Sequence, residues 1–194
     1  MPRSKAFDES VVLEKAVNLF WKNGYHATSM QDLVEHLGIN RASLYGTYGD
    51  KKTLFQKAFQ RYRRDSISQV KAFLASEENV KEGLFRLMLG ACNETMCDPE
   101  RKGCFSVNTT TELVPNDPEI KTVLMENRKR LETIFEAYLQ QGVDRGQINS
   151  GKDLKSIATH LFTFYNGLQI ISKVADDPDH LQSALTVALS VLDD

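Results

Sequence analysis

The chain has 194 residues, of which 41% are hydrophobic and 26% are charged, as in ordinary globular proteins. No uncharged apolar run is long enough to cross a bilayer, and the charged N-terminus lacks the apolar region of a signal peptide. We therefore expect a cytoplasmic protein without a membrane partner. Three cysteines without a secretion signal argue against a disulfide framework, and four scattered histidines do not suggest a metal site. No metal or cofactor is expected.

The charge is distributed unevenly along the chain. Residues 1–75 carry 12 Lys and Arg against 7 Asp and Glu, and residues 76–194 carry 12 against 19. The net charges are +5 and −7, which sum to the −2 of the whole chain. A basic first part favours contact with a polyanion such as nucleic acid. Chance unevenness is the alternative reading of the charge alone.

The first two predicted elements are short helices that end at glycines. Asp8 is placed to cap a helix that ends at Asn23-Gly24. Thr28 and Gln31 have the spacing of a capping box, and the helix that they would begin ends at Gly38.

A third, very short helix over 41–47 follows, capped by Asn40. Asp50 then caps a fourth helix that runs to about Ser76. Every later segment also has helical periodicity, and no strand pattern is found. The later helices are predicted at 79–97, shortly after Gly103, at 118–142, at 153–175 and at 179–192.

Two helices joined across "HLGIN" match a helix-turn-helix, whose second helix enters the major groove of DNA. A helix as short as 41–47 is not stable alone. Neighbouring elements must therefore hold it in place so that one of its faces can contact a partner. Arg41 can pair with guanine in the major groove, and hydroxyl groups suit phosphate oxygens. Lys51 lies in the first turn of a helix, where a cation is unfavourable unless a phosphate lies nearby. A helical hairpin with an incidentally basic face is the alternative.

The stretch "TSMQDLVEHLGINRASLYGTYGDKKTLF" resembles the DNA-binding signature of the TetR family of bacterial repressors. The resemblance covers about 60 N-terminal residues. Val34, Gly46-Thr47 and Tyr48 depart from the usual pattern. The matching positions are Thr28, Leu33, Gly38, Ile39, Leu44, Tyr45, Lys51 and Leu54.

The resemblance implies an all-α protein with an N-terminal three-helix helix-turn-helix domain and a C-terminal helical ligand-binding and dimerisation domain. The domains would be 1–50 and 77–194, with the fourth helix, 51–76, as the link. The implied function is a ligand- or redox-responsive repressor that binds a palindromic double-stranded DNA operator. The implied DNA-binding residues are Thr28, Ser29, Arg41, Ala42, Ser43, Tyr45, Thr47, Tyr48 and Lys51.

The resemblance also implies a homodimer through roughly 153–192. Two apolar stripes near the chain end, with no later element to cover them, favour this pairing. Burial of both stripes within one chain is the alternative. One stripe comprises Leu161, Phe164, Tyr165, Leu168 and Ile171, and the other Leu181, Ala184, Leu185, Ala188, Leu189 and Leu192.

A small-molecule cavity in the C-terminal part is expected from the same resemblance. Aromatic and Met-rich walls suit such a pocket, although they equally suit an ordinary core. The candidate lining residues are Phe85, Met88, Leu89, Cys92, Met96, Phe105, Asn108, Phe135, Tyr138, Phe162 and Tyr165.

Cys104 follows two cations and a glycine and should begin a helix, which favours a thiolate. The surrounding "RKGCFSVNTTTEL" is similar to a segment of TetR-family repressors that respond to electrophiles and oxidants. In the family arrangement Lys173 would lie near this thiol. Cys92 and Cys97 are expected to be buried and less reactive. A small buried core side chain is the alternative for Cys104.

Two other functions fit parts of the sequence. One is a small all-helical enzyme with Cys104 as its nucleophile, but no histidine or acid is placed as its partner. The other is an adaptor that uses the helical pair for protein contact rather than DNA contact. We expect a regulator and not an enzyme.

Overall fold

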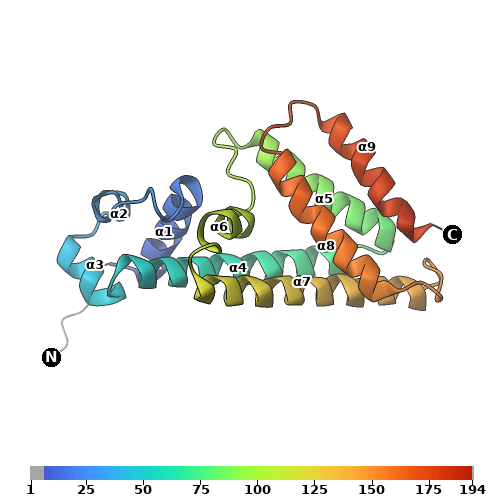
Figure 1. Ribbon diagram of the computed structural model, residues 1–194, viewed down its shortest axis with the longest axis horizontal. Coiled ribbons are helices and arrows are strands. Elements are labelled where there is room, and N and C mark those ends of the chain that lie inside the picture. Colours follow the sequence, from blue (N-terminus) through green and yellow to red (C-terminus); the bar gives the residue numbers. More distant parts are fainter. Residues whose placement is uncertain (1–6, 194) are drawn as a thin grey trace. The chain divides into compact units, whose positions relative to one another are not determined.

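The computed structural model describes residues 7–193, and these residues form an all-helical fold (Figure 1). Residues 1–6 and 194 of the predicted domains lie outside the described part. The α-helices are α1 (Glu9–Asn23), α2 (Met30–Leu37), α3 (Arg41–Tyr48), α4 (Lys51–Ala75), α5 (Val80–Cys97), α6 (Phe105–Leu113), α7 (Pro118–Asp144), α8 (Leu154–Ile171) and α9 (Pro178–Leu189), and a 3-10 helix, η1 (Ser190–Leu192), follows.

The chain forms two compact units that meet at Asp65 and Ser66, inside α4. The sequence-based division assigned all of α4 to a link between the domains. In the structure the first part of α4 contributes Leu54, Phe55 and Phe59 to the core of the first unit. This part of α4 therefore belongs to the first unit because its apolar face is buried there.

The first unit is built from α1, α2, α3 and the beginning of α4. Its centre is aromatic: the ring of Phe20 packs edge-on against that of Phe55, with 5.2 Å between the ring centroids. Leu33 of α2 and Leu44 of α3 are fully buried. The two short helices are thus held by one apolar core, which gives them the tertiary support that short helices need.

Local capping explains where the short helices begin. Ser29 Oγ accepts a hydrogen bond from the Asp32 amide at 3.1 Å, and Asp32 accepts one from the Ser29 amide at 2.8 Å. The capping box of α2 is therefore Ser29 with Asp32, and the predicted box of Thr28 with Gln31 is wrong by one residue. The Asp8 and Asn40 caps are present as predicted, because their side chains accept from Ser10 and Ser43 amides.

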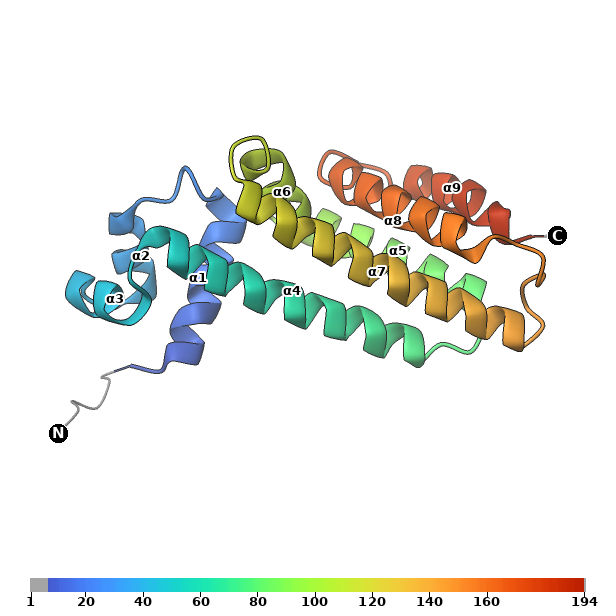
Figure 2. The same ribbon diagram turned by 60° about the horizontal axis from the view of Figure 1, so that its bottom comes forward.

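The second unit packs α8 on α7 and α9 on α5, as Figure 2 shows from another side. Its core includes residues from α4, α5, α7, α8 and α9. Two predicted boundaries shift: α8 ends at Ile171 rather than at residue 175, and α9 ends at Leu189 before η1.

The apolar stripe of α9 is covered within the chain. Leu181, Leu185 and Leu189 are each at most 2% exposed, and they belong to the core of the second unit. For these leucines the alternative reading, burial within one chain, therefore holds, because the stripe packs within a unit in which the earlier helix α5 contacts α9.

Candidate nucleic-acid interface

The helix α3 presents one face and buries the other. Asn40 begins the helix, with its side chain accepting from the Ser43 amide at 2.8 Å, and Gly49 ends it. Leu44 is fully buried, whereas Arg41 and Ala42 are exposed. The eight-residue helix is thus fixed by its ends and its buried face, and its outer face is open to a partner.

Tyr45 lies on the same outer face as Arg41. Its side chain is 44% exposed, and the guanidinium carbon of Arg41 lies 6.0 Å from the centre of its ring. A guanidinium at this distance from an aromatic ring is attracted to the ring face. The ring of Tyr45 therefore favours particular orientations of Arg41 before any partner is bound.

The remaining predicted contacts on α3 differ in exposure. Ser43 and Thr47 are half-buried, so part of each hydroxyl-bearing side chain remains accessible. Tyr48, by contrast, is only 4% exposed, and its hydroxyl donates to the Glu9 carbonyl at 3.3 Å. Burial raises the pKa of Tyr48, and the nearby Glu9 adds to this effect. We therefore assign Tyr48 to the core, in place of the predicted phosphate contact.

The two predicted DNA contacts just before α2, Thr28 and Ser29, also differ in exposure. Ser29 is exposed and caps α2. Thr28 is fully buried, and its hydroxyl donates to the Gly24 carbonyl at 2.6 Å. The Thr28 side chain therefore holds the loop between α1 and α2 and is not available to a ligand. Lys51 Nζ donates to the main-chain carbonyls of Tyr25 and Thr28.

The predicted ligand-lining residues of the second unit fall into two groups. Met88, Cys92, Phe105, Phe135 and Tyr138 are at most 3% exposed. The others are half-buried, and a contact of either group with a ligand stays a prediction. The half-buried members are Phe85, Leu89, Met96, Asn108, Phe162 and Tyr165.

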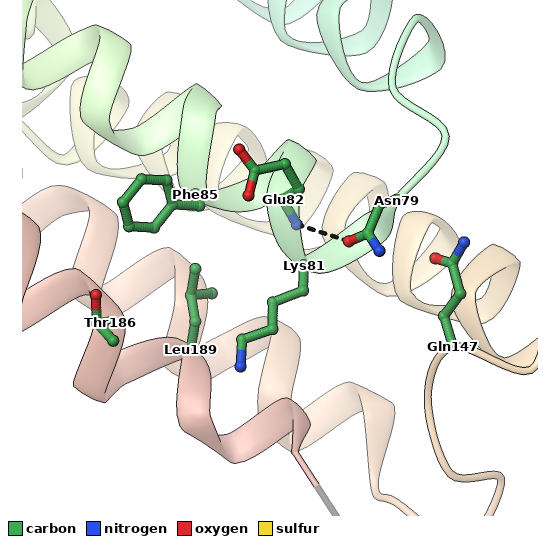
Figure 3. Close-up of a pocket in the computed structure, with 7 residues that line it drawn as sticks. All are labelled: Asn79, Lys81, Glu82, Phe85, Gln147, Thr186 and Leu189. Carbon is green, nitrogen blue, oxygen red and sulfur yellow. Dashed lines mark hydrogen bonds between the residues drawn. The ribbon is translucent and has the colours of Figure 1, made fainter.

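A pocket of about 510 Å³ lies beside α5 and α9, and Phe85 is the predicted ligand residue that lines it (Figure 3). Its volume is within the range of small-molecule sites. Five of its seven lining residues are polar, however, and two of these side chains already have partners within the chain: Asn79 accepts from the Glu82 amide at 2.9 Å, and Lys81 pairs with Asp193. The lining residues are Asn79, Lys81, Glu82, Phe85, Gln147, Thr186 and Leu189.

The three cysteines occupy different environments. Burial raises the pKa of the Cys92 thiol to about 11, as expected for a core thiol. Cys97 is exposed, so its predicted burial is wrong; it is the last residue of α5, and its side chain faces solvent. Cys104 is half-buried at the N-cap position of α6, where the sequence analysis placed it.

Lys173 lies beside the segment that precedes Cys104. A methyl group added at Gly103 would lie 3.0 Å from Lys173 Cδ, and Lys173 Nζ donates to Asn108 Oδ1 of α6 at 3.2 Å. The structure thus brings Lys173 next to the first turn of α6. Burial raises the pKa of Tyr165, and the neighbouring Cys104 adds to this effect.

Arg101, one of the two cations that precede Gly103 and Cys104, is held by contacts far along the chain. Its backbone has a positive φ of 45°, and its Nη1 donates to the carbonyls of Lys173 at 3.3 Å and Ala175 at 2.7 Å. No local sequence signal identifies these partners, which are more than 70 residues away. The Ser29-x-x-Asp32 box, in contrast, carries a recognisable capping pattern.

Among residues 7–193, no group of His, Cys, Asp and Glu side chains could hold a metal ion. None of the helices in the same range is long and apolar enough to cross a membrane.

The comparisons with known proteins identify the family. A family model described as bacterial regulatory proteins of the tetR family matches residues 12–58, and one described as a tetracyclin repressor-like C-terminal domain matches residues 83–188. The chain belongs to the TetR family. It is therefore a helix-turn-helix, DNA-binding transcriptional repressor of the TetR type rather than an enzyme.

Several relatives share this TetR-family architecture over most of their length. The HTH-type transcriptional regulator YezE of Bacillus subtilis (strain 168) is 38% identical over 100% of both chains. The HTH-type transcriptional repressor ComR of Escherichia coli (strain K12) is 31% identical over 88% of this chain and 82% of its own. A cysteine mutant of the TetR-family regulator CifR, solved with 26-bp double-strand operator DNA, is 25% identical and covers 96% of this chain and 98% of its own, with a TM-score of 0.85.

Proposed function

We propose that this repressor binds a palindromic operator as a homodimer and places α3 of each subunit in the major groove. The observation that carries the proposal is the outer face of α3, where Arg41, Ala42 and Tyr45 are exposed while Leu44 holds the helix from behind. Arg41 would read guanine and Tyr45, Ser43 and Thr47 would contact the backbone of the DNA. Ser29, exposed at the beginning of α2, is a further candidate for a phosphate contact.

A dimer is supported by apolar side chains that the chain leaves exposed. Ile170 and Ile171 end α8 and are 49% and 47% exposed, and Val174 shortly after them is 74% exposed. Val187 on α9 is 72% exposed. Exposed apolar side chains close together, such as Ile170, Ile171 and Val174, are typical of interaction surfaces. These residues, and not the buried leucines of α9, are the proposed contacts between subunits.

The DNA-binding proposal is tested by measuring affinity for random and selected duplexes at several salt concentrations. A repressor that contacts phosphates should lose affinity linearly in log salt, with a slope of about −0.9 per phosphate contacted. Arg41→Ala should weaken the preferred duplex by about 1–3 kcal/mol and the random duplex much less. Arg64→Ala is the matched control, because Arg64 is 73% exposed on α4 and pairs with Asp65. Equal losses on both duplexes would show that Arg41 reads no base.

We also propose that an effector acts on the second unit, either as a small molecule or as an electrophile at Cys104. The second possibility is supported by the position of Cys104 at the beginning of α6, next to the segment that contacts Lys173. Addition of the thiol across an activated carbon–carbon double bond would form a carbon–sulfur bond and transfer the thiol proton to the neighbouring carbon. This reaction requires no oxidant.

The effector proposal is tested with N-ethylmaleimide and an operator-bound sample. Modification of Cys104, located by mass spectrometry, should release DNA from the wild type and not from Cys104→Ser. The single helix α4, which contributes residues to both units, would carry the change to the first unit. If the electrophile releases DNA from Cys104→Ser as it does from the wild type, the electrophile acts elsewhere and Cys104 is not the sensor.

A further inference from the structure

Lys51 begins α4, and the first unit surrounds its ammonium group with groups of its own. Lys51 Nζ donates to the main-chain carbonyl oxygens of Tyr25 and Thr28, each at 2.8 Å. The same nitrogen lies 4.4 Å from the centre of the Tyr25 ring. An ammonium has three N–H donors, and two carbonyls with one ring face account for all three. The group therefore has its partners before DNA is present.

The carbonyls that accept from Lys51 belong to the loop between α1 and α2. Thr28 directly precedes Ser29, the N-cap of α2. Thr28 is fully buried, and its hydroxyl donates to the Gly24 carbonyl, so this loop is held by its own hydrogen bond as well. Lys51 thus connects the first turn of α4 with the residue that precedes the first turn of α2.

The connection also accounts for a cation at the N-terminus of a helix. The helix dipole disfavours positive charge at that end, and the sequence analysis expected a phosphate to compensate. The two carbonyl oxygens provide negative partial charges at hydrogen-bond distance. The compensation is therefore internal to the protein.

We propose that Lys51 is a positioning residue for DNA binding and not a phosphate contact. It fixes the beginning of α2 to the beginning of α4, and α3 follows α2 after the short turn of Gly38, Ile39 and Asn40. The position of α3 in the first unit then depends on the contact between Lys51 and Thr28. This inference rests on the proposed DNA-binding function of α3.

A phosphate contact and a positioning contact at Lys51 predict different dependences of DNA affinity on salt concentration. Removal of a phosphate contact should change the slope of log affinity against log salt by about one. Removal of a positioning contact should lower affinity at every salt concentration and leave that slope unchanged. It should also loosen the loop between α1 and α2 in the free protein, which a phosphate contact would not do.

The first experiment uses the wild-type protein, so no substituted protein has to fold for it to succeed. Free protein is treated with an amine-acetylating reagent, and labelling of Lys51 and of the adjacent, exposed Lys52 is compared by mass spectrometry. We expect Lys51 to label about tenfold more slowly than Lys52 without DNA, as its hydrogen bonds must first open. DNA should add little further protection at Lys51. Equal labelling without DNA, followed by protection of Lys51 with DNA, would overturn the proposal.

The second experiment compares Lys51→Met, Lys51→Arg and the control Lys52→Met. Lys51→Met should raise amide hydrogen exchange at Ser29 and Asp32, the two amides of the capping box, by about tenfold and leave the salt slope of DNA affinity unchanged. Lys51→Arg, which can still donate to both carbonyls, should restore most of the affinity and protection. Lys52→Met should not alter exchange in the loop. A slope reduced by about one in Lys51→Met, with unchanged exchange, would identify a phosphate contact instead.

The labelling and exchange measurements are made on DNA-free protein. If the protein does not bind DNA at all, the proposed function fails, yet the slow labelling of Lys51 would still be observed. If DNA binds but Lys51 labels as fast as Lys52, only the positioning role fails.

Discussion

Arg101 Nη1 donates to the main-chain carbonyl of Ala175 at 2.7 Å, and so joins the loop before α6 to the segment after α8. The same nitrogen reaches the Lys173 carbonyl at 3.3 Å, and Nη2 lies 3.6 Å from the Asp176 carboxylate. Carbonyls near a helix C-terminus lack intrahelical donors, and an arginine can supply them. Arg101 also has a left-handed backbone, with φ at 45°, which a non-glycine residue seldom adopts without compensating contacts.

Arg101→Ala should therefore lower the free energy of unfolding by about 1–2 kcal/mol, because hydrogen bonds from a charged donor are lost. Urea denaturation measures the change. Arg128→Ala is the control, since Arg128 is exposed and its nearest Glu132 oxygen lies 3.7 Å away. Its ion pair should contribute no more than about 1 kcal/mol. Similar small losses in both variants would show that the Arg101 contacts contribute little to stability.

The close approach of α5 to α7 depends on Gly83. A Cβ atom at this position would lie 2.9 Å from Glu77 Cβ and 3.2 Å from Tyr138 Cζ, and still closer to the Tyr138 hydroxyl. Gly83→Ala should destabilise the protein by about 1–3 kcal/mol through overpacking. Thermal denaturation of Gly83→Ala alone and in a Tyr138→Phe background tests the cause. The cost should be smaller in the Phe background; an equal cost there would exclude the hydroxyl as the obstacle.

The proposed subunit contact predicts which valines matter for association. Val174→Glu and Val187→Glu place charges on side chains that are 74% and 72% exposed in one chain. Each should produce a folded monomer, because an unpaired charge in an apolar interface is costly. Val11→Glu on α1, at 49% exposure, is the control and should remain dimeric. Sedimentation distinguishes the 21.9 kDa chain from its dimer. Dimers of unchanged affinity in both the Val174 and the Val187 variant would refute this surface.

The buried Cys92 thiol predicts a loss of stability in alkaline solution. Its pKa is raised from 9.0 to about 11 by burial, so the folded state favours the neutral thiol. Below pH 9 the thiol is protonated in both states, and stability is unaffected. As pH rises from about 9 to about 11, the unfolded state ionises first, and stability falls by an amount of order 2 kcal/mol.

Urea denaturation between pH 8 and pH 10.5 measures this dependence. Cys92→Ala should flatten the alkaline decline relative to the wild type, whereas Cys97→Ala should leave it unchanged because Cys97 is exposed. Parallel declines in all three proteins would mean that Cys92 ionises equally in both states.

The sequence predicted those parts of the structure that short segments determine. Asn40 and Gly49 fix the ends of α3 through bonds within four residues, so the helix was readily located. The cap of α2 was misplaced by one residue, because Thr28 and Ser29 are both good caps. Arg101 contacts Ala175, 74 residues along the chain, and Lys51 contacts Thr28, 23 residues away. Local sequence patterns do not predict contacts between segments so far apart.

The same reason limited the prediction of the site. The pattern of α3 identified Arg41 and Tyr45 as outer residues, and both are exposed. The family resemblance added Tyr48, which lies outside the predicted helix of 41–47; in the structure it is the last residue of α3 and is buried, because the side of so short a helix that faces the core depends on its neighbours. Likewise, the apolar stripe of α9 was real, but periodicity alone does not state whether α5 or a second subunit covers it.

Selection from random duplexes shows whether α3 reads a two-fold symmetric DNA site. The pure protein and Arg41→Ala are each used to enrich bound DNA, and the enriched sequences are compared. We expect inverted half-sites whose centres are separated by about 10 base pairs or a multiple, since each subunit would place α3 in one major groove. Arg41→Ala should relax the preference at one guanine in each half-site. If the wild type enriches no symmetric sequence, α3 does not read a two-fold symmetric site. If both proteins enrich the same guanines, Arg41 does not read them.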